Sequence, residues 1–370
     1  MAGKRSHPDQ QPHLRNILHD DLRRGDFGRT MRRDYTELKE VFLDDNRKTR
    51  LKEMKQPKRW LVTSWWLLKA LFLKLKPARR LLLILAAVIM LMPNTVQYSG
   101  DRLRVSTETS SIAVAILLFI LMLELKDKLL AHDELEAGRA VQTALMPEQT
   151  PEIPGWSAWL FTRTANEVGG DLVDLQALDA TRFRVSLADV AGKGLKAALF
   201  TAKLQATLRA LAPDVPTMGE LAAKLNRIFY RDSLRNSFAS LVCIELNTGD
   251  GMIRIVNAGH PPPLHVRGGA ILETKKGDPA IGIVPEFSYS EHQVLLETGE
   301  VLLIYSDGLT EAKNEQGQFF GVQRLMDILP RLSNSDARNI GELLVQDVDR
   351  FVGEAKVYDD LSLVVLRRKS

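Results

Sequence analysis

The residues of this chain with the clearest chemical potential are four aspartates that stand where predicted strands meet loops. Carboxylates in such positions bind hard divalent cations, and a nearby glycine lets the backbone approach the ion closely. If one sheet system brought all four together, they would hold two cations with a water between them. That arrangement equips a metal-dependent phosphate hydrolase. The four residues are Asp171, Asp189, Asp307 and Asp359.

Each aspartate lies in a short motif that is ambiguous by itself. Asp171 follows a pair of glycines and Asp307 precedes one, so a simple turn explains either. Asp359 starts an apolar strand, where a solvated carboxylate is equally expected. Asp189 ends a strand, and the Gly-Lys-Gly turn and helix that follow resemble a phosphate-binding loop. The spacing of a P-loop is absent, which argues against a nucleoside triphosphatase of that class.

Length and cysteine content set further limits. With 370 residues the chain suits two or three domains. Cys243 is the only cysteine, which excludes an intramolecular disulfide and a cysteine-rich zinc site. It lies in the apolar run 241–246, where a buried structural role is favoured over a nucleophilic one.

The elements that must position the aspartates follow a break at residues 146–156, where three prolines and a glycine interrupt a helical pattern. From there on, short β-type runs separated by turn signals alternate with amphipathic helices. This pattern predicts an α+β layered domain in which helices cover antiparallel sheets. The expected strands are 156–163, 171–178, 182–190, 238–246, 253–258, 301–305 and 361–367, and the expected helices are 195–211, 217–231 and 339–352.

The N-terminal part differs in character. Its first 59 residues are polar and basic without a cleavable signal pattern, and we expect them to be helical or partly disordered. Between Arg47 and Arg80, twelve lysines and arginines accompany one acid, Glu53. In residues 60–76 the mixture of tryptophan, leucine and lysine predicts a helix in the membrane interface. An amphipathic helix that packs on protein is the alternative.

Two apolar runs, 81–92 and 112–123, flank a polar loop at residues 99–109. Basic residues lie outside the pair on both sides, as the positive-inside rule expects of a hairpin with both ends in the cytoplasm. We therefore predict a transmembrane hairpin in a multi-pass inner-membrane protein, with the C-terminal domain in the cytoplasm. A buried helical hairpin in a soluble dimerisation domain is the alternative.

The predicted organisation has four regions. A polar basic N-terminal region is followed by the interfacial helix with its two-helix hairpin, by a charged helical linker and by the α+β domain. These regions span residues 1–59, 60–123, 124–147 and 148–370.

Taken in order, the motifs of residues 140–367 resemble those of the protein phosphatase 2C-type (PPM) family, in its bacterial SpoIIE/RsbU branch. Nothing before them resembles a family, although membrane-anchored N-termini are common in this branch. The matching segments are VGGDLVD at 168–174, ADVAGKGLKAAL at 188–199, LNRIFY at 225–230, FASLVCIELNTGDGMIRIVNAGHPPPL at 238–264, LLIYSDGLTEAKN at 302–314, FFG at 319–321 and DDLSLVVLR at 359–367.

The resemblance implies a β-sandwich of two antiparallel sheets flanked by helices, with two Mn²⁺ or Mg²⁺ ions at one edge. Asp189 would bridge the ions and the carbonyl of Val190 would bind one of them. Asp307 and Asp359 would hold the other ion, and Asp171 would lie beside the cluster. A water activated between the metals would hydrolyse phosphoserine or phosphothreonine. The implied substrate is a phosphorylated STAS-domain anti-anti-sigma factor in a partner-switching pathway.

Five more residues are candidates for supporting the metal ligands or contacting the substrate. Surface or turn-stabilising roles compete with these functions, and for the histidine we favour a turn-stabilising role. The five are Asp174, Gly192, Lys193, His260 and Asp360.

Other functions fit the sequence less well. A membrane-bound regulatory scaffold that uses the phosphatase fold without turnover is disfavoured, because every ligand position carries an aspartate. Nucleic-acid binding through residues 47–80 is disfavoured because apolar residues interleave with the basic ones. We expect the chain to form a homodimer. We also expect the helical linker before the α+β domain to control dimerisation and the order of the metal site.

Overall fold

The computed structural model describes residues 42–52, 54–91, 95–100, 103–212, 215–232, 237–274 and 277–369, together with Tyr35, Leu38 and Lys39. Most of the predicted N-terminal region 1–59 therefore lies outside the described residues. The chain divides into two compact units, Met1–Lys128 and Leu129–Ser370. This division falls inside one continuous helix, α6 (Thr109–Leu145). The predicted domain boundaries stay predictions.

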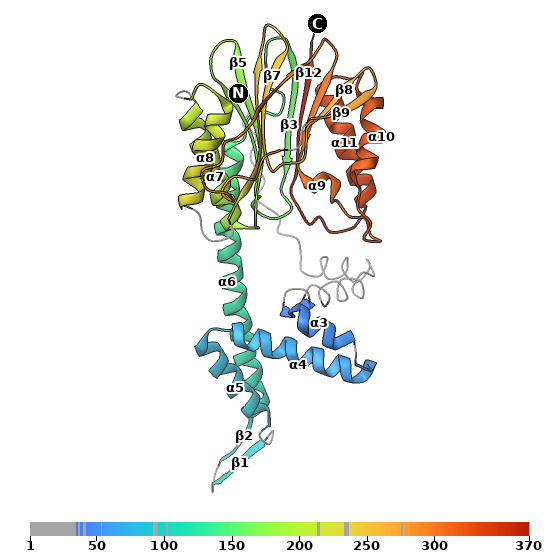
Figure 1. Ribbon diagram of the computed structural model, residues 1–370. Helices are drawn as coiled ribbons and strands as arrows, with labels where there is room; N and C mark the ends of the chain where they lie inside the picture. Colours follow the sequence, from blue (N-terminus) through green and yellow to red (C-terminus); the bar gives the residue numbers. More distant parts are fainter. Residues whose placement is uncertain are drawn as a thin grey trace, which may run out of the picture. The chain divides into compact units, whose positions relative to one another are not determined.

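The first unit consists of helices and one β-hairpin (Figure 1). Where the sequence predicted a loop at residues 99–109, two strands pair in antiparallel register between α5 and α6. At the other end of α5, the guanidinium of Arg79 donates to Glu124 at 2.6 Å and to Asp127 at 2.8 Å. These bonds fasten the start of α5 to α6. The elements are α3 (Asp45–Lys52), α4 (Gln56–Lys74), α5 (Pro77–Leu91), β1 (Thr95–Gly100), β2 (Leu103–Glu108) and the first part of α6.

The prediction of a multi-pass inner-membrane protein is wrong. Among the helices of the described residues, none is both long enough and apolar enough to span a bilayer. With 15 residues, α5 extends about 22 Å, short of the roughly 30 Å of a hydrocarbon core. In α6 the apolar run ends at Glu124, where a charged segment begins. The prediction of a transmembrane hairpin at residues 81–92 and 112–123 is wrong for the same reason, and the interfacial helix at residues 60–76 stays a prediction.

The second unit is a sandwich of two five-stranded antiparallel sheets with helices on both outer faces (Figure 1). The first sheet has the order β10-β7-β6-β5-β4 and the second has the order β3-β12-β11-β8-β9. Its strands are β3 (Trp156–Arg163), β4 (Asp171–Ala177), β5 (Arg182–Val190), β6 (Ala239–Asn247), β7 (Met252–Ala258), β8 (Leu264–Arg267), β9 (Ala270–Glu273), β10 (Glu291–Leu295), β11 (Val301–Tyr305) and β12 (Leu361–Arg368).

Successive side chains along a strand point to opposite faces of its sheet, and this alternation separates the inner core from the helix-covered outer layers. On β5, Val185 and Leu187 point into the core between the two sheets, whereas Ala188 and Val190 pack against the helices on the outer face. On β11 all five residues are buried, because both faces of this central strand are covered. The predicted α+β sandwich is thus confirmed.

The helices complete the two outer layers. The first sheet is covered by α7 (Leu195–Leu211) and α8 (Met218–Asp232), and the second by α10 (Val322–Leu332) and α11 (Ala337–Val352). A short helix, α9 (Asp307–Thr310), follows β11 directly. β5, β11 and β12 are inner strands, and β4 is the edge strand paired with β5. The loops at their ends are therefore anchored to the covered sheets.

Candidate metal centre

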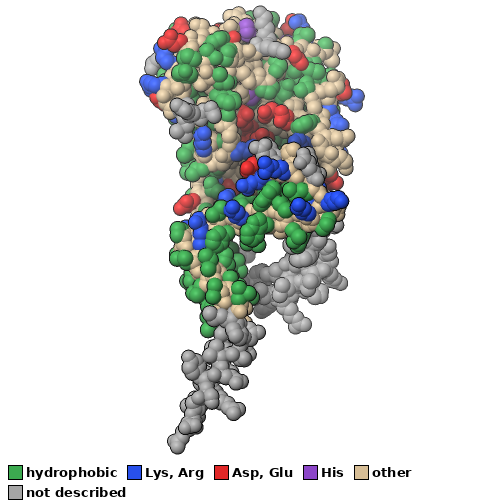
Figure 2. Space-filling view, turned by 60° about the horizontal axis from the view of Figure 1, so that its bottom comes forward, with side chains coloured by type: hydrophobic (Ala, Val, Ile, Leu, Met, Phe, Trp, Pro, Cys, Tyr) green, Lys and Arg blue, Asp and Glu red, His purple; other side chains and the backbone are tan. Residues whose placement is uncertain are grey.

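The four aspartates lie at the ends of strands from both sheets. Asp171 starts β4 and Asp189 lies near the end of β5, and the antiparallel register places them directly opposite each other. Asp307 follows β11, and Asp359 precedes β12, the neighbour of β11 in the second sheet. Acidic side chains gather in a recess of the space-filling view (Figure 2). The structure therefore brings together the four residues that the sequence singled out.

Asp360 fastens the two sheets to each other at this end. Its carboxylate accepts hydrogen bonds from the backbone amides of Ala165 at 2.7 Å, Gly170 at 2.6 Å and Asp171 at 3.3 Å. A carboxylate that accepts several backbone N–H groups is well satisfied without a cation. Asp360 therefore fixes the turn that carries Asp171 and need not bind a metal.

Glycine is required where the loops meet. A Cβ atom on Gly308 would lie 1.9 Å from the carbonyl oxygen of Asp360, so no other residue fits there without moving the backbone. A Cβ atom on Gly170 would lie 3.1 Å from the carbonyl oxygen of Val190 and 3.7 Å from Oδ1 of Asp189. These two glycines let the loops from the two sheets approach the carboxylates closely.

The carboxylates raise one another's pKa values. Burial, followed by the charge of Asp189, raises the pKa of Asp171 well above its usual range. Partial burial and then the charges of Asp307 and Asp359 raise the pKa of Asp189 to about 7. Burial and the charge of Asp359 also raise the pKa of Asp307. The aspartate cluster thus carries more negative charge than the nearby basic side chain of Lys193 neutralises.

The donor set fits a hard divalent cation. Oδ2 of Asp171 is buried and has no hydrogen-bond partner in the described structure. As the side chains lie, no three carboxylate, imidazole or thiol groups of the described residues enclose a common metal position. An oxygen-only set of this kind suits Mg²⁺ or Mn²⁺ over zinc or copper.

Lys193 is the basic residue that contacts Asp359, the most exposed aspartate of the cluster, in the described structure. Its Nζ lies 3.5 Å from Oδ2 of Asp359 and donates to the carbonyl oxygen of Tyr358. The preceding Gly192 has a φ of 119°, which favours glycine and turns the chain sharply between β5 and α7. Lys193 thus faces Asp359 of the aspartate cluster, and Gly192 shapes the turn that brings it there.

Asp174 and His260 do not join the cluster. Asp174 lies on the helix-covered face of β4, where it accepts from Arg209 at 2.6 Å and from Gln205 at 2.9 Å. The imidazole of His260 is buried, its Nδ1 lies 2.8 Å from the hydroxyl of Ser240, and burial lowers its pKa to about 4. The side chain of Asn257 bonds both backbone groups of His260, an arrangement that stabilises a turn.

Sequence reasoning missed three residues that hold the backbone of the site. The amide of Gln142 on α6 pairs with both backbone groups of Gly169, at 2.9 and 3.1 Å. The hydroxyl of Thr201 donates to the carbonyl of Gly170 at 2.7 Å. Ser306 accepts from the amide of Ser362 at 3.0 Å. Only Ser306 had a local signal, because it stands beside Asp307.

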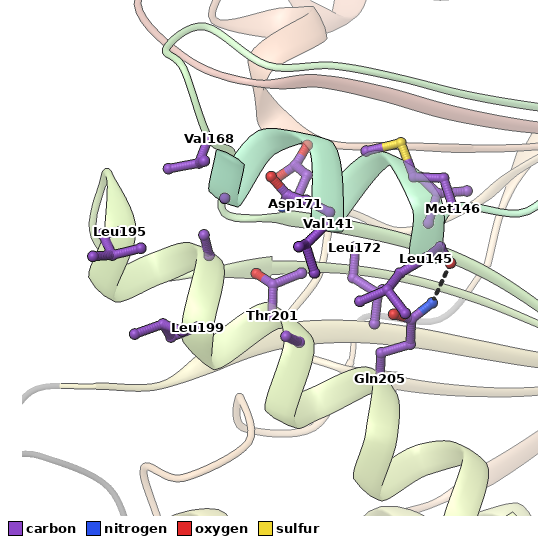
Figure 3. Close-up of a pocket in the computed structure, with 15 residues that line it drawn as sticks. Val141, Leu145, Met146, Val168, Asp171, Leu172, Leu195, Leu199, Thr201 and Gln205 are labelled. Atoms are coloured by element: carbon purple, nitrogen blue, oxygen red, sulfur yellow. Dashed lines mark hydrogen bonds between the residues drawn. The ribbon is translucent and has the colours of Figure 1, made fainter. Parts of the chain in front are cut away.

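An apolar cavity of about 240 Å³ separates the end of α6 from α7 (Figure 3). Val141 and Leu145 line it from α6, and Leu195 and Leu199 line it from α7. The amide of Gln205 closes one side by donating to the carbonyl of Leu145 at 2.9 Å. The end of α6 is therefore loosely packed next to the turn that carries Asp171.

The fold of this chain is that of the protein phosphatase 2C class. It has two stacked antiparallel sheets, helices on both outer faces and carboxylates gathered at one end. The family model "Stage II sporulation protein E (SpoIIE)" matches residues 179–369, more than half of the chain. The chain belongs to this family, and the resemblance to the SpoIIE/RsbU branch is confirmed.

Two curated proteins are similar in sequence to this chain, and the name of one of them describes a phosphatase. Protein IcfG of Synechocystis sp. is 24% identical over 264 residues, which cover 64% of this chain and 41% of IcfG. Phosphoserine phosphatase RsbU of Bacillus subtilis is 23% identical over 238 residues, which cover 64% of this chain and 70% of RsbU. The chain thus spans less than half of IcfG and about two thirds of RsbU. The family match and the name of RsbU support the predicted serine/threonine phosphatase.

Solved structures agree on the fold. The SiaA-PP2C domain of Pseudomonas aeruginosa matches with a TM-score of 0.57 and 19% identity, over 65% of this chain and 98% of that domain. The RsbU and RsbW domains of Rv1364c from Mycobacterium tuberculosis match with a TM-score of 0.51 and 23% identity, over 59% of this chain and 61% of that one.

Proposed function

We propose that this chain is a metal-dependent protein phosphatase that hydrolyses phosphoserine or phosphothreonine in a partner protein. The observation that carries the proposal is the meeting of four aspartates from two sheets. One of them, Asp171, has a buried carboxylate oxygen without a hydrogen-bond partner among the described residues. Family membership supports the reaction class. Two divalent cations, when bound, would supply an activated water and neutralise charge on the phosphoryl oxygens.

The residues of the chain would divide the work of holding those cations. In this proposal Asp189 would offer its carboxylate to both ions, and Val190 would offer its carbonyl to one of them. Asp307 and Asp359 would hold the second ion, and Asp171 would support the cluster directly or through a water. The raised pKa values of Asp189 and Asp307 fit this assignment, because the negative charge that raises them is charge that a divalent cation would neutralise.

Other side chains would orient the site. Asp360 and Gln142 hold the turn before Asp171 through its backbone, and Thr201 holds the same turn from α7. Lys193 would move from Asp359 to the substrate phosphate once a cation neutralises that carboxylate. His260 stays neutral in its buried position and has no assigned proton transfer.

We further propose that the substrate is a STAS-type anti-anti-sigma regulator in a partner-switching pathway. RsbU, a phosphoserine phosphatase by name, supports this choice. The predicted homodimer stays a prediction.

The test uses the purified full chain, Mn²⁺ or Mg²⁺ and a phosphoserine peptide. We expect metal-dependent phosphate release that Asp189→Ala and Asp307→Ala abolish. Asp327→Asn on α10 is the matched control, since this exposed aspartate bonds only Gln323 among the described residues. Full turnover by either alanine variant would contradict the assignment. Peptide binding without turnover by the unmodified chain would support a regulatory scaffold instead.

A further inference from the structure

A small recess lies beside the aspartate cluster, against the second sheet and α11. Its volume is about 70 Å³, and Asp359 and Gly308, the residue after Asp307, form one part of its wall. Lys313 and Tyr358 form another part. A protein whose phosphoserine entered the proposed metal centre would therefore also lie close to Lys313.

Lys313 stands on a short hairpin that follows α9. It forms an antiparallel bridge with Phe319, and residues opposed in this way place their side chains on the same face. At the tip of the hairpin, Oδ1 of Asn314 accepts from the backbone amide of Gln318 at 2.8 Å. The next aromatic residue, Phe320, is buried in the core that α10 and α11 form with the second sheet. The hairpin is therefore anchored, and it presents Lys313 and Phe319 together.

Two exposed aromatic rings hold the ammonium group of Lys313. Its Nζ lies 4.9 Å from the centre of the Phe319 ring and 5.5 Å from the centre of the Tyr358 ring. Phe319 is 54% exposed and Tyr358 is 51% exposed. Each exposed cation–π contact is weak, but two of them together limit the conformations of a long side chain. The rings therefore position the ammonium group at the surface.

Lys313 lacks the acidic partner that its basic neighbours have. Arg163, in the wall of the same recess, pairs with a carboxylate of α11 at 2.6 Å, and Lys193 pairs with Asp359 at 3.5 Å. No carboxylate of the described residues forms an ion pair with Lys313, although Glu311 also lines the recess. The wall has three basic side chains against two acidic ones. The charge of the recess therefore favours an acidic partner.

The position of Lys313 limits what it would contact in a substrate. Lys193 lies against the carboxylate of Asp359 and the carbonyl of Tyr358, whereas Lys313 lies against the ring of Tyr358. Lys193 is thus the lysine placed to meet the phosphoryl group. An extended chain advances about 3.3 Å per residue, so a side chain a few residues from the phosphoserine would reach Lys313.

We propose that Lys313, held between Phe319 and Tyr358, binds an acidic side chain of the substrate protein near its phosphoserine. This inference rests on the proposed function and adds a determinant of substrate choice to it. Lys313 would recognise the sequence around the phosphoserine and would take no part in breaking the phosphate ester bond.

The test compares two phosphoserine peptides with the full chain and Mn²⁺. One peptide has aspartates on both sides of the phosphoserine, and asparagines replace them in the other. The unmodified chain should prefer the acidic peptide by about fivefold in kcat/KM, as an exposed ion pair allows. The ratio of the two kcat/KM values is compared within each variant, so that a change in metal binding cancels.

Three variants separate the charge of Lys313 from its packing. Lys313→Met keeps an apolar stem between the rings and should lose most of the preference. Lys313→Arg keeps the charge and stacks on aromatic rings, so it should retain the preference. Lys224→Met, at an exposed lysine of α8, is the matched control and should also retain it.

The two proposals fail in different ways. Hydrolysis of para-nitrophenyl phosphate by the unmodified chain reports the metal centre without a peptide, and its absence would contradict the proposed function. In that case the fluorescence anisotropy of labelled peptides gives the same preference as a ratio of Kd values. Equal use or equal binding of the two peptides by the unmodified chain would overturn the role of Lys313, as would an unchanged preference in Lys313→Met.

Discussion

Two aspartates on one strand have opposite surroundings. Asp171 and Asp174 are three residues apart on β4, and both are buried. Asp174 faces the helices and is paired with Arg209 and Gln205, whereas Asp171 faces the other carboxylates and leaves one oxygen without a partner in the described structure. Residue type and burial are therefore poor guides to a metal ligand. The missing counter-charge is the feature that distinguishes it.

The largest expected effect concerns catalysis. Asp189→Asn should lower kcat/KM for a phosphoserine peptide by roughly a thousandfold, since about 4 kcal/mol of transition-state stabilisation depends on the bridging carboxylate. Steady-state kinetics at saturating Mn²⁺ measure this loss. Asp174→Asn is the matched comparison and should retain activity within about tenfold. Equal losses in both variants would erase the distinction between the two aspartates.

The next effect concerns pH. In the unfolded chain Asp189 should titrate near 3.8, the ordinary pKa of an aspartate, whereas in the folded chain its pKa is about 7. Between these values the folded state binds more protons, so the free energy of unfolding of the metal-free chain should fall as pH rises through this window. Urea unfolding at a series of pH values measures the slope, and Asp189→Asn should flatten it.

Cations should reverse that trend. Because Mn²⁺ competes with protons for the carboxylates, it should stabilise the chain more above pH 7 than at pH 5. At a hundredfold excess over Kd the gain should be about 2.7 kcal/mol. A gain from Mn²⁺ that is the same at both pH values would show that the ion binds elsewhere.

A comparison of stabilities separates the two kinds of aspartate further. Asp174→Asn should lower the free energy of unfolding by about 2 kcal/mol. This loss is smaller than that expected on breaking a fully buried ion pair, because the side chain of Arg209 is 41% exposed. Asp171→Asn should leave the metal-free chain at least as stable near pH 7.5, since it removes a buried carboxyl group that lies beside Asp189 and has one oxygen without a partner in the described structure. Chemical denaturation without metal checks both, and a stability loss in Asp171→Asn like that in Asp174→Asn would refute the contrast.

The smallest effect concerns α6. Gln142→Ala removes two hydrogen bonds to Gly169, which should cost about 1 kcal/mol and weaken Mn²⁺ binding by less than tenfold. Calorimetric titration measures the affinity. Val141→Ala changes the neighbouring apolar cavity without touching the bonds to Gly169 and is the control. Unchanged affinity in Gln142→Ala would show that α6 does not support the metal ligands.

Local patterns predicted the best-defined elements. The bounds of β3, β5, β11 and α7 agree with the sequence analysis, because each is a long periodic or fully apolar run bounded by turn residues. The short edge strands β9 and β10 were missed, since most of their residues remain partly exposed and polar positions break the alternation. In α10, Pro330 obscures a helix whose apolar face the second sheet covers.

The site was predictable only in part. Asp171, Asp189, Asp307 and Asp359 could be found because glycines and strand ends mark them. Asp360 was predicted only as a candidate supporting residue and Gln142 not at all, since their partners Gly170 and Gly169 lie 190 and 27 residues away in the chain. The membrane prediction failed because hydropathy was judged over runs of a dozen residues, too short to span a bilayer.

The central claim is that the four aspartates bind two divalent cations, and its most direct test is the stoichiometry of Mn²⁺ binding. Isothermal titration of the full chain and of Asp189→Asn gives the number of ions and their affinities. The account predicts two ions for the unmodified chain and loss of at least one in Asp189→Asn, with Asp174→Asn unchanged. The same stoichiometry and affinity in Asp189→Asn as in the unmodified chain would contradict it.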